Sequence, residues 1–62
     1  MEIEFMVTQE ADGGLVAECL THDVFTQGNS WKELRANVQE AVCAFFFDQP
    51  VPSFIFSKIQ NA

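Results

Sequence analysis

The feature that most constrains this chain is an amphipathic helical segment that starts at Ser30 and runs to the phenylalanines at 45–47. Ser30 is expected to accept the backbone N–H of Glu33 while the Glu33 carboxylate reaches back to Ser30, which is the capping-box arrangement. Apolar residues then recur at three- and four-residue steps, forming one stripe at about 100° per residue. The stripe comprises Leu34, Val38, Ala41, Val42 and Phe45, with Trp31 and Phe46 at its margin. Such a stripe has to be buried, so the sequence predicts a helix lying on a sheet.

Two segments before the helix predict a β-hairpin. Residues 2–10 alternate apolar and polar side chains, as in a half-buried strand. The turn is expected at Asp12-Gly13-Gly14, because glycine tolerates positive φ. Residues 15–21 then return as the second strand. The predicted inward-facing residues are Ile3, Phe5 and Val7 on the first strand and Leu15, Ala17 and Cys19 on the second.

The register of this hairpin depends on the length of its loop. A loop at 12–14 places Val7 opposite Cys19 and Leu20 opposite Met6, with Leu20 on the outer face beside Val16. A two-residue loop would shift the pairing by one residue and turn the return strand over.

A third strand at 24–27 and a last strand at 54–59 complete the expected fold. The two prolines at 50 and 52 end the helix. The order β-β-β-α-β predicts a single α+β domain over residues 1–62. Its four-stranded, mostly antiparallel sheet has strand order 3-2-1-4, and one helix crosses one face by a right-handed connection.

The aromatic content is high for a domain of this size, so either the core is unusually aromatic or part of the aromatic residues lie in a subunit interface, which we favour. Seven Phe and one Trp occur in 62 residues, and a chain this short buries only about 60% of its unfolded surface. The last strand is apolar on both faces, with Phe54 and Phe56 on one and Ile55 and Ile59 on the other. One helix cannot cover both faces, so we expect a second subunit to cover the other.

The three consecutive phenylalanines at 45–47 leave two alternatives open. They turn through about 200° on a helix, so one sheet cannot cover them all. Either Phe47 and Cys43 are covered by the tail, another subunit or a partner, or the helix ends near Phe46 and Phe47 packs under the proline turn.

The charge of the chain argues against binding to nucleic acid. Nine acidic residues face three basic ones, for a net charge of −6, whereas a nucleic-acid binder needs a basic stripe to neutralise phosphates. An acidic surface suits a basic partner protein. The same acidity also suits solubility alone.

No pattern in the sequence predicts catalysis or a cofactor. The single histidine, His22, lies in a turn and is interpreted as a surface or packing residue. No His/Cys spacing suits a structural zinc ion. Glu2, Glu4 and Glu40 invite comparison with a metal-dependent nuclease, but they are scattered and are better interpreted as solvated side chains. We expect no enzyme activity, no metal and no cofactor.

The cellular location of the protein is inferred from two sequence patterns that are absent. The N-terminus has no signal-peptide pattern and no run reaches transmembrane length, so we expect a cytoplasmic protein without membrane contact. Cys43 falls roughly opposite Leu34 on the helix and away from Cys19, so an intramolecular disulfide is not expected.

A series of short motifs resembles the HicB-like antitoxin family. They are Asp12-Gly13-Gly14, Ala17-Glu18-Cys19, Thr26-Gln27-Gly28, Ser30-Trp31-Lys32-Glu33-Leu34 and Asn37-Val38-Gln39-Glu40-Ala41-Val42. Each is structural, and their order and spacing over residues 2–47 carry the resemblance. It implies a partial ribonuclease H-like fold, self-association and masking of a small basic RNA-cleaving toxin, HicA.

The chain departs from that family in two places. The segment between strands two and three is shortened to residues 20–24, and we expect a core domain without a separate DNA-binding domain. Repression of its own operator is therefore not expected, and a toxin partner is not assured for this short, stand-alone form.

The resulting hypothesis is a non-catalytic protein-binding module that forms a homo-oligomer, most simply a dimer, and binds a small basic toxin. The alternative is a stand-alone structural or small-ligand-binding dimer. Five apolar interface candidates and three acidic, partner-facing candidates follow: Met6, Leu20, Phe47, Phe54 and Phe56; and Glu2, Glu4 and Glu18.

Overall fold

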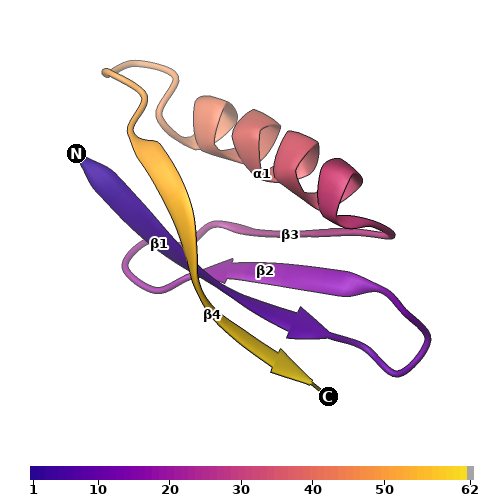
Figure 1. The fold of residues 1–62 in the computed structure, drawn as a ribbon. Helices are drawn as coiled ribbons and strands as arrows, with labels where there is room; N and C mark the ends of the chain where they lie inside the picture. Colours follow the sequence, from indigo (N-terminus) through magenta and orange to yellow (C-terminus); the bar gives the residue numbers. More distant parts are fainter. Residues whose placement is uncertain (62) are drawn as a thin grey trace.

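Four strands and one helix follow the predicted order in the computed structural model, which describes residues 1–61 (Figure 1). The sheet has the order β3-β2-β1-β4. The hairpin strands pair antiparallel and β4 pairs parallel to β1. The predicted α+β fold and strand order are therefore confirmed. The elements are β1 (Glu2–Gln9), β2 (Leu15–Cys19), β3 (Phe25–Gly28), α1 (Trp31–Phe45) and β4 (Ser53–Asn61).

The β1–β2 loop has the predicted length of three residues, but it lies one residue earlier in the chain. Gly13 has a φ of 94°, and the Asp12 carboxylate accepts the backbone N–H of Gly14 at 3.0 Å. The backbone N–H of Glu10 donates to the Gly14 carbonyl at 2.7 Å, so these two residues close the loop, which spans residues 11–13 rather than 12–14.

Moving the loop back by one residue moves the pairing by two positions. Val7 lies opposite Ala17 and not opposite Cys19. Leu20 donates its N–H to the Glu4 carbonyl at 3.0 Å, so Leu20 neighbours Glu4 and not Met6. Because the side-chain period of a strand is two, this shift leaves every residue on the face where it was predicted.

The helix begins at the predicted cap, although one half of the capping box differs. Ser30 Oγ accepts the Glu33 N–H at 3.1 Å. The Glu33 carboxylate reaches one residue further back than expected and accepts the N–H of Asn29, not of Ser30, at 2.8 Å. Both bonds satisfy backbone N–H groups at the helix start.

The core lies between α1 and the facing side of the sheet. Leu34, Val38 and Val42 are the buried residues of the helix. The odd-numbered apolar residues of β1 and β2 belong to the same buried cluster. The whole buried cluster is Ile3, Phe5, Val7, Leu15, Ala17, Cys19, Val24, Leu34, Val38, Val42 and Phe46.

The end of the helix reverses the expected roles of two phenylalanines. The helix stops at Phe45, and Phe46 caps it with a φ of −106° and a ψ of 34°. This turn of the backbone buries the Phe46 ring in the core and leaves Phe45 exposed. Phe47 is 82% exposed, so it does not pack under the proline turn.

The last strand contains a bulge that changes which residues share a face. Phe5 pairs with Phe56 but Met6 pairs with Lys58, so Ser57 is the extra residue. A bulge of one residue turns the following side chains over. Ile59 therefore lies on the helix side, beside Val7, and does not share a face with Ile55.

We expect Gly28→Ala to lower the free energy of unfolding by about 1–3 kcal/mol, as overpacking does. A Cβ at Gly28 would lie 2.7 Å from the backbone N of Leu34 and 2.9 Å from its Cα. Because these are backbone atoms, the first turn of the helix would have to move. Urea unfolding followed by circular dichroism measures the change.

Gly14→Ala is the matched control for this substitution. Its Cβ would meet only side-chain atoms of Asp12 and Glu10, at 3.3 Å and beyond, so a change within about 0.5 kcal/mol is expected. Equal losses for the two variants would contradict the proposed close approach of α1 to β3.

Ser30→Ala should cost about 1 kcal/mol of unfolding free energy, because it removes the side-chain oxygen that accepts the Glu33 N–H. Ser30→Asp retains an acceptor at this position and should stay within about 0.5 kcal/mol of the parent. Thermal and urea unfolding of the two variants separate the loss of the cap from the loss of the serine itself.

Candidate functional site

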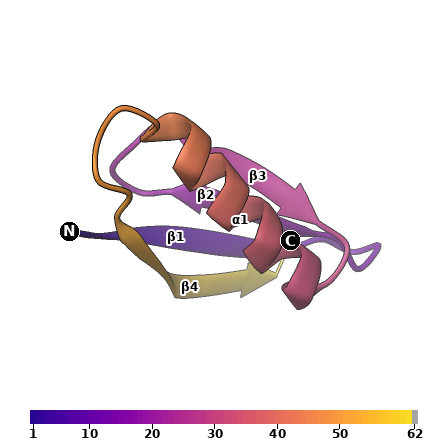
Figure 2. The same cartoon turned by 90° about the horizontal axis from the view of Figure 1, so that it is seen from above.

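The face of the sheet opposite α1 carries most of the residues that the sequence singled out. The even-numbered residues of β1 and β2 point to this side, because the odd-numbered ones are buried under the helix. Among residues 1–61 no helix or strand covers this face (Figures 1 and 2). We call it the outer face.

Cross-strand pairing defines the arrangement of side chains on the outer face. One row runs across all four strands as Phe25, Glu18, Met6 and Lys58. Beside it, Leu20, Glu4 and Ile55 form a second row. Neighbouring residues in such rows have Cβ atoms about 5 Å apart, so apolar and acidic side chains alternate at contact distance.

The outer face is unusually apolar for a surface open to solvent. Phe25 is 63% exposed, Leu20 50% and Ile55 41%, while Met6 and Val16 are half-buried on the same face. Single exposed apolar residues are common, but a group of them on one flat face is typical of a binding site.

The charge of the outer face is mostly negative. Glu2 pairs with Ser53 at the start of the sheet, and Glu4 and Glu18 stand among the apolar side chains. Lys58 is the basic residue on this face. The outer face therefore combines exposed apolar side chains with a negative potential, which favours a partner whose surface carries Lys or Arg.

The predicted interface candidates separate into three groups. Met6 and Leu20 lie together on the outer face with the acidic candidates Glu2, Glu4 and Glu18. Phe47 lies apart, just beyond the C-terminal end of α1. Phe54 and Phe56 lie on the helix side, half-buried against the core, so they do not contribute to the outer face.

Phe25 and Ile55 are the outer-face residues that were missed as candidates. Val24 and Phe25 are adjacent, and neighbouring residues of an extended chain point to opposite sides. Since Val24 is buried, Phe25 had to face outward. The same alternation beside Phe54 and Phe56 assigns Ile55 to the outer face.

The histidine packs against aromatic rings. The His22 ring stands edge-on to those of Phe45 and Phe46, with centroids 5.9 and 5.3 Å away. Its Nδ1 lies 2.8 Å from Thr21 Oγ1 and 4.0 Å from Cys19 Sγ. These contacts confirm the interpretation of His22 as a packing residue at the end of the core.

The two cysteines do not form a disulfide. Cys19, the last residue of β2, is buried, whereas Cys43 is exposed on α1. Gln39 donates to Cys43 Sγ at 3.2 Å.

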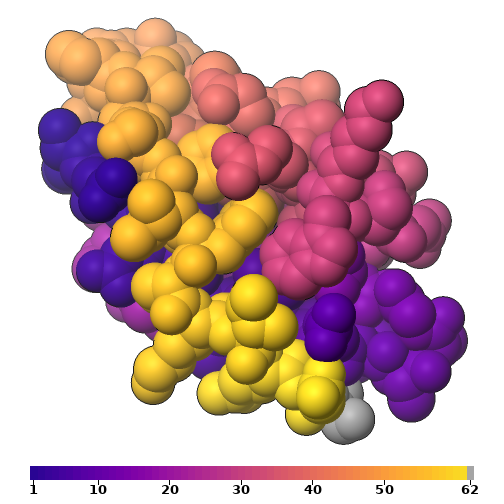
Figure 3. All heavy atoms as spheres, in the orientation of Figure 1, coloured from indigo at the N-terminus to yellow at the C-terminus, as the bar shows by residue number. Residues whose placement is uncertain are grey.

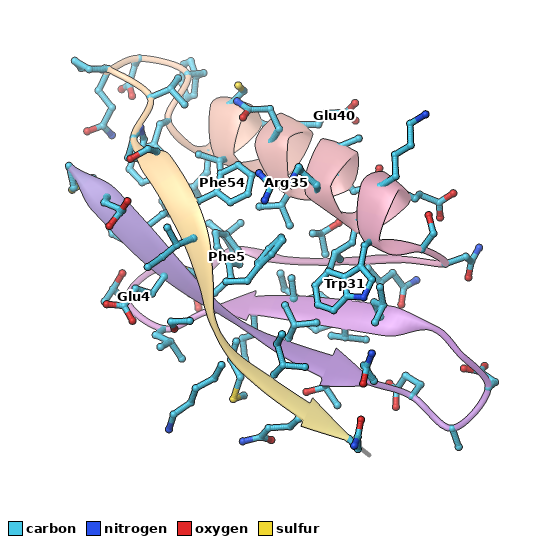
Figure 4. The ribbon with its side chains drawn as sticks, viewed as in Figure 1. Glu4, Phe5, Trp31, Arg35, Glu40 and Phe54 are labelled. Carbon is cyan, nitrogen blue, oxygen red and sulfur yellow. The ribbon has the colours of Figure 1, made fainter. Side chains whose placement is uncertain are left out.

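The carboxylates considered for a metal-dependent nuclease do not converge. Glu4 projects from β1 away from α1, whereas Glu40 projects from the outward side of the helix (Figure 4). Glu2 lies on the same outer face as Glu4. Within residues 1–61 no three His, Cys, Asp or Glu side chains are placed to share one metal ion. The sheet and the helix separate Glu40 from the other two.

A polar groove of about 710 Å³ lies where the β1–β2 loop meets the start of α1. Three of the polar side chains that line it form hydrogen bonds within the chain. Asp12 holds the Gly14 N–H and Glu33 holds the Asn29 N–H, while Asn37 donates to the Gln27 carbonyl at 2.7 Å. These bonds tie the hairpin and the helix in place, which is a structural role.

No helix in residues 1–61 combines the length and the apolar character that crossing a membrane requires.

Comparison with known proteins identifies one informative relative. A "UPF0150 protein" of Thermotoga maritima is 32% identical over 57 residues, which cover 92% of this chain and 80% of the relative. No model of a protein family matches the chain, and no solved structure matches it either. At this identity and coverage of both sequences, the chain belongs to the UPF0150 family.

Proposed function

We propose that this chain is a non-catalytic protein-binding module that holds a basic partner protein on its outer face. The observation that carries the proposal is the juxtaposition of exposed Phe25, Leu20 and Ile55 with Glu4 and Glu18 on an uncovered sheet. Burial of the apolar side chains would supply affinity at about 25 cal/mol per Å² of area removed from water. The carboxylates would select a cationic partner and speed its approach.

The position of the acids favours a cation-bearing partner over a second copy of the same face. An isologous contact would place equivalent surfaces against one another, and Glu4 and Glu18 would then face carboxylates of the other copy. Lys58 alone offers little compensation on this face. Lys and Arg from a different protein would pair with these carboxylates instead.

The resemblance to HicB-like antitoxins gives the partner a specific identity. We propose a small, basic, HicA-like RNA-cleaving toxin, which this chain would neutralise by covering its active site. The same role accounts for a protein that needs neither a metal nor a catalytic group of its own. A cytoplasmic location belongs to this proposal, since RNA cleavage by such a toxin takes place there.

Self-association is the second part of the proposal, and it uses a different surface. Phe47 and Val51 are exposed in the connection between α1 and β4. Met1 is also exposed and its carbonyl accepts the Ser53 N–H at 3.1 Å, so the chain's start lies beside this connection. These apolar side chains offer a dimer contact that leaves the outer face free.

The partner proposal predicts that Glu4→Lys and Glu18→Lys each weaken capture of the partner by at least about tenfold, since close charge pairs at interfaces contribute 1.5 kcal/mol or more. Tagged protein is used to isolate partners from the native host at low ionic strength and at about 0.5 M salt. The recovered protein is then purified, and its cleavage of RNA is measured with and without this chain.

Glu40→Lys is the matched control, because it makes the same change of charge on the outward side of α1. It should bind as the parent does. The proposal fails if the captured protein is acidic, if it cleaves RNA equally well in the complex, or if Glu40→Lys weakens binding as much as Glu4→Lys.

The dimer proposal predicts that the parent sediments as a dimer at micromolar concentration and that Phe47→Ser shifts it to monomer. Phe47 is 82% exposed, so its replacement should leave the fold intact, with little change in the unfolding midpoint. Leu20→Ser on the outer face serves as the comparison and should remain dimeric. A monomeric parent would contradict self-association without affecting the proposal for the outer face.

A further inference from the structure

The helix side of β4 forms a second surface, distinct from the outer face. α1 crosses the sheet diagonally (Figure 2), and its Cα atoms come within 8 Å of those of β2 and β3 but not of those of β1 or β4. Phe54 and Phe56 of β4 are therefore reached only by long side chains from the helix. Trp31 meets Phe56 with ring centroids 5.8 Å apart.

Arg35 joins this aromatic group from the helix. Its guanidinium carbon lies 5.8 Å from the centre of the Phe54 ring and 5.6 Å from that of Phe56. In Figure 4 the Arg35 side chain extends from α1 toward Phe54. At these distances the guanidinium is attracted to the faces of both rings, and its N–H groups can still form a bidentate contact with a carboxylate.

A groove of about 510 Å³ opens between this side of α1 and the start of β4. It is lined by Lys32, Arg35, Ala36, Gln39, Ser53 and Phe54. The four helix residues follow an i, i+3, i+4, i+7 spacing and so share one side of the helix. In the space-filling view the side chains of α1 and those of β4 border each other on this side of the molecule (Figure 3).

The charge of this groove is opposite to that of the chain as a whole. The chain has three basic residues and a net charge of −6, yet Lys32 and Arg35 both line this one groove. An anionic occupant is favoured here, while the rest of the molecule repels it.

The strand beside the groove has a free edge. In the order β3-β2-β1-β4 the last strand pairs only with β1, so the other edge of β4 carries unpaired backbone groups over residues 53–61. Such an edge accepts an added strand. The bulge at Ser57 interrupts it, and the stretch before the bulge, 53–56, is the part that borders the groove.

From these observations we propose that the free edge of β4 at 53–56, together with Lys32 and Arg35, binds an extended acidic peptide segment of another protein. The segment would add a strand beside β4 through backbone hydrogen bonds. Alternate side chains of an added strand point to one face, so its acidic residues on the helix side would meet Arg35 and Lys32. This site is separate from the outer face, and its test does not depend on the function proposed for that face.

The probe for the test is a fluorescein-labelled, nine-residue synthetic peptide in which glutamate alternates with threonine, matching the nine residues of β4. Fluorescence anisotropy with the purified chain should give saturable binding. A peptide with lysine in place of glutamate should not bind. An oligothymidylate of similar length tests a nucleic acid as the occupant, and its tighter binding would overturn the proposal.

Charge-reversal variants of the basic residues test whether the peptide binds at the proposed site. Lys32→Glu and Arg35→Glu should each weaken peptide binding by about tenfold or more, a loss typical of charged pairs. Lys58→Glu makes the same change of charge on the outer face, beyond the bulge, and should change binding by less than about twofold. If Lys32→Glu and Lys58→Glu weakened peptide binding equally, binding would depend only on the net charge of the chain, which would contradict the proposed site. Lys32 is exposed, so its variant tests the proposal even if loss of the Arg35 stacking destabilises the fold.

Backbone methylation tests strand addition. Two further peptides carry N-methyl groups on alternate residues, one in each phase. Because only one edge of a strand pairs with β4, one phase should abolish binding and the other should preserve it. Equal binding by both methylated peptides would show that charge alone holds the peptide and would overturn the proposed strand addition.

Discussion

The close approach of the helix start to β3 determines much of this structure. Gly28 lies so near Leu34 that a Cβ would fall 2.7 Å from its backbone nitrogen, and Asn37 is tied to the Gln27 carbonyl one turn further on. These contacts hold the first turns of α1 close to β3. Because the helix backbone stays more than 8 Å from that of β4, the inner side of β4 is filled by long side chains.

The aromatic residues are the consequence of this offset. Phe5 and Phe54 pack edge to face with centroids 5.9 Å apart, and Trp31 and Arg35 reach across from the helix to complete the layer. Large flat side chains span a gap that a second helix would otherwise fill. The phenylalanines on the helix side thus have a structural role. The exposed phenylalanines lie elsewhere, on the outer face and at the end of the helix.

The fold followed from the sequence because its determinants are local. The cap at Ser30, the Asp12-Gly13-Gly14 turn and the two periods of hydrophobicity each depend on residues close in sequence. The register of the β1–β2 hairpin could not be predicted in the same way. The position of its loop depends on the backbone hydrogen bond from Glu10 to Gly14, which many residue types can make. The exchange of Phe45 and Phe46 has a similar origin, since the point at which the helix unwinds decides which ring is buried.

The candidate surfaces were harder to predict than the fold. Met6, Leu20 and the acids of the outer face could be assigned from alternation alone, and Ile55 and Phe25 carried the same signal. The bulge at Ser57 could not be foreseen, because no residue type marks it, and it transfers Ile59 to the helix side. Nor does any sequence pattern indicate that the backbone of α1 approaches β3 more closely than β4, so that Arg35 reaches the two phenylalanines of β4 with its long side chain.

The two sides of this small sheet differ in sign as well as in shape. Glu2, Glu4 and Glu18 face outward, whereas Lys32 and Arg35 border the groove on the helix side. A sheet is only one residue thick, so its two faces are close enough to influence each other electrostatically at physiological salt, where the Debye length is about 8 Å. A cationic partner on the outer face would therefore screen the acids there and lessen their attraction for the basic groove. That change would make the groove more available to an anionic segment, so occupancy of one face should favour, rather than compete with, occupancy of the other.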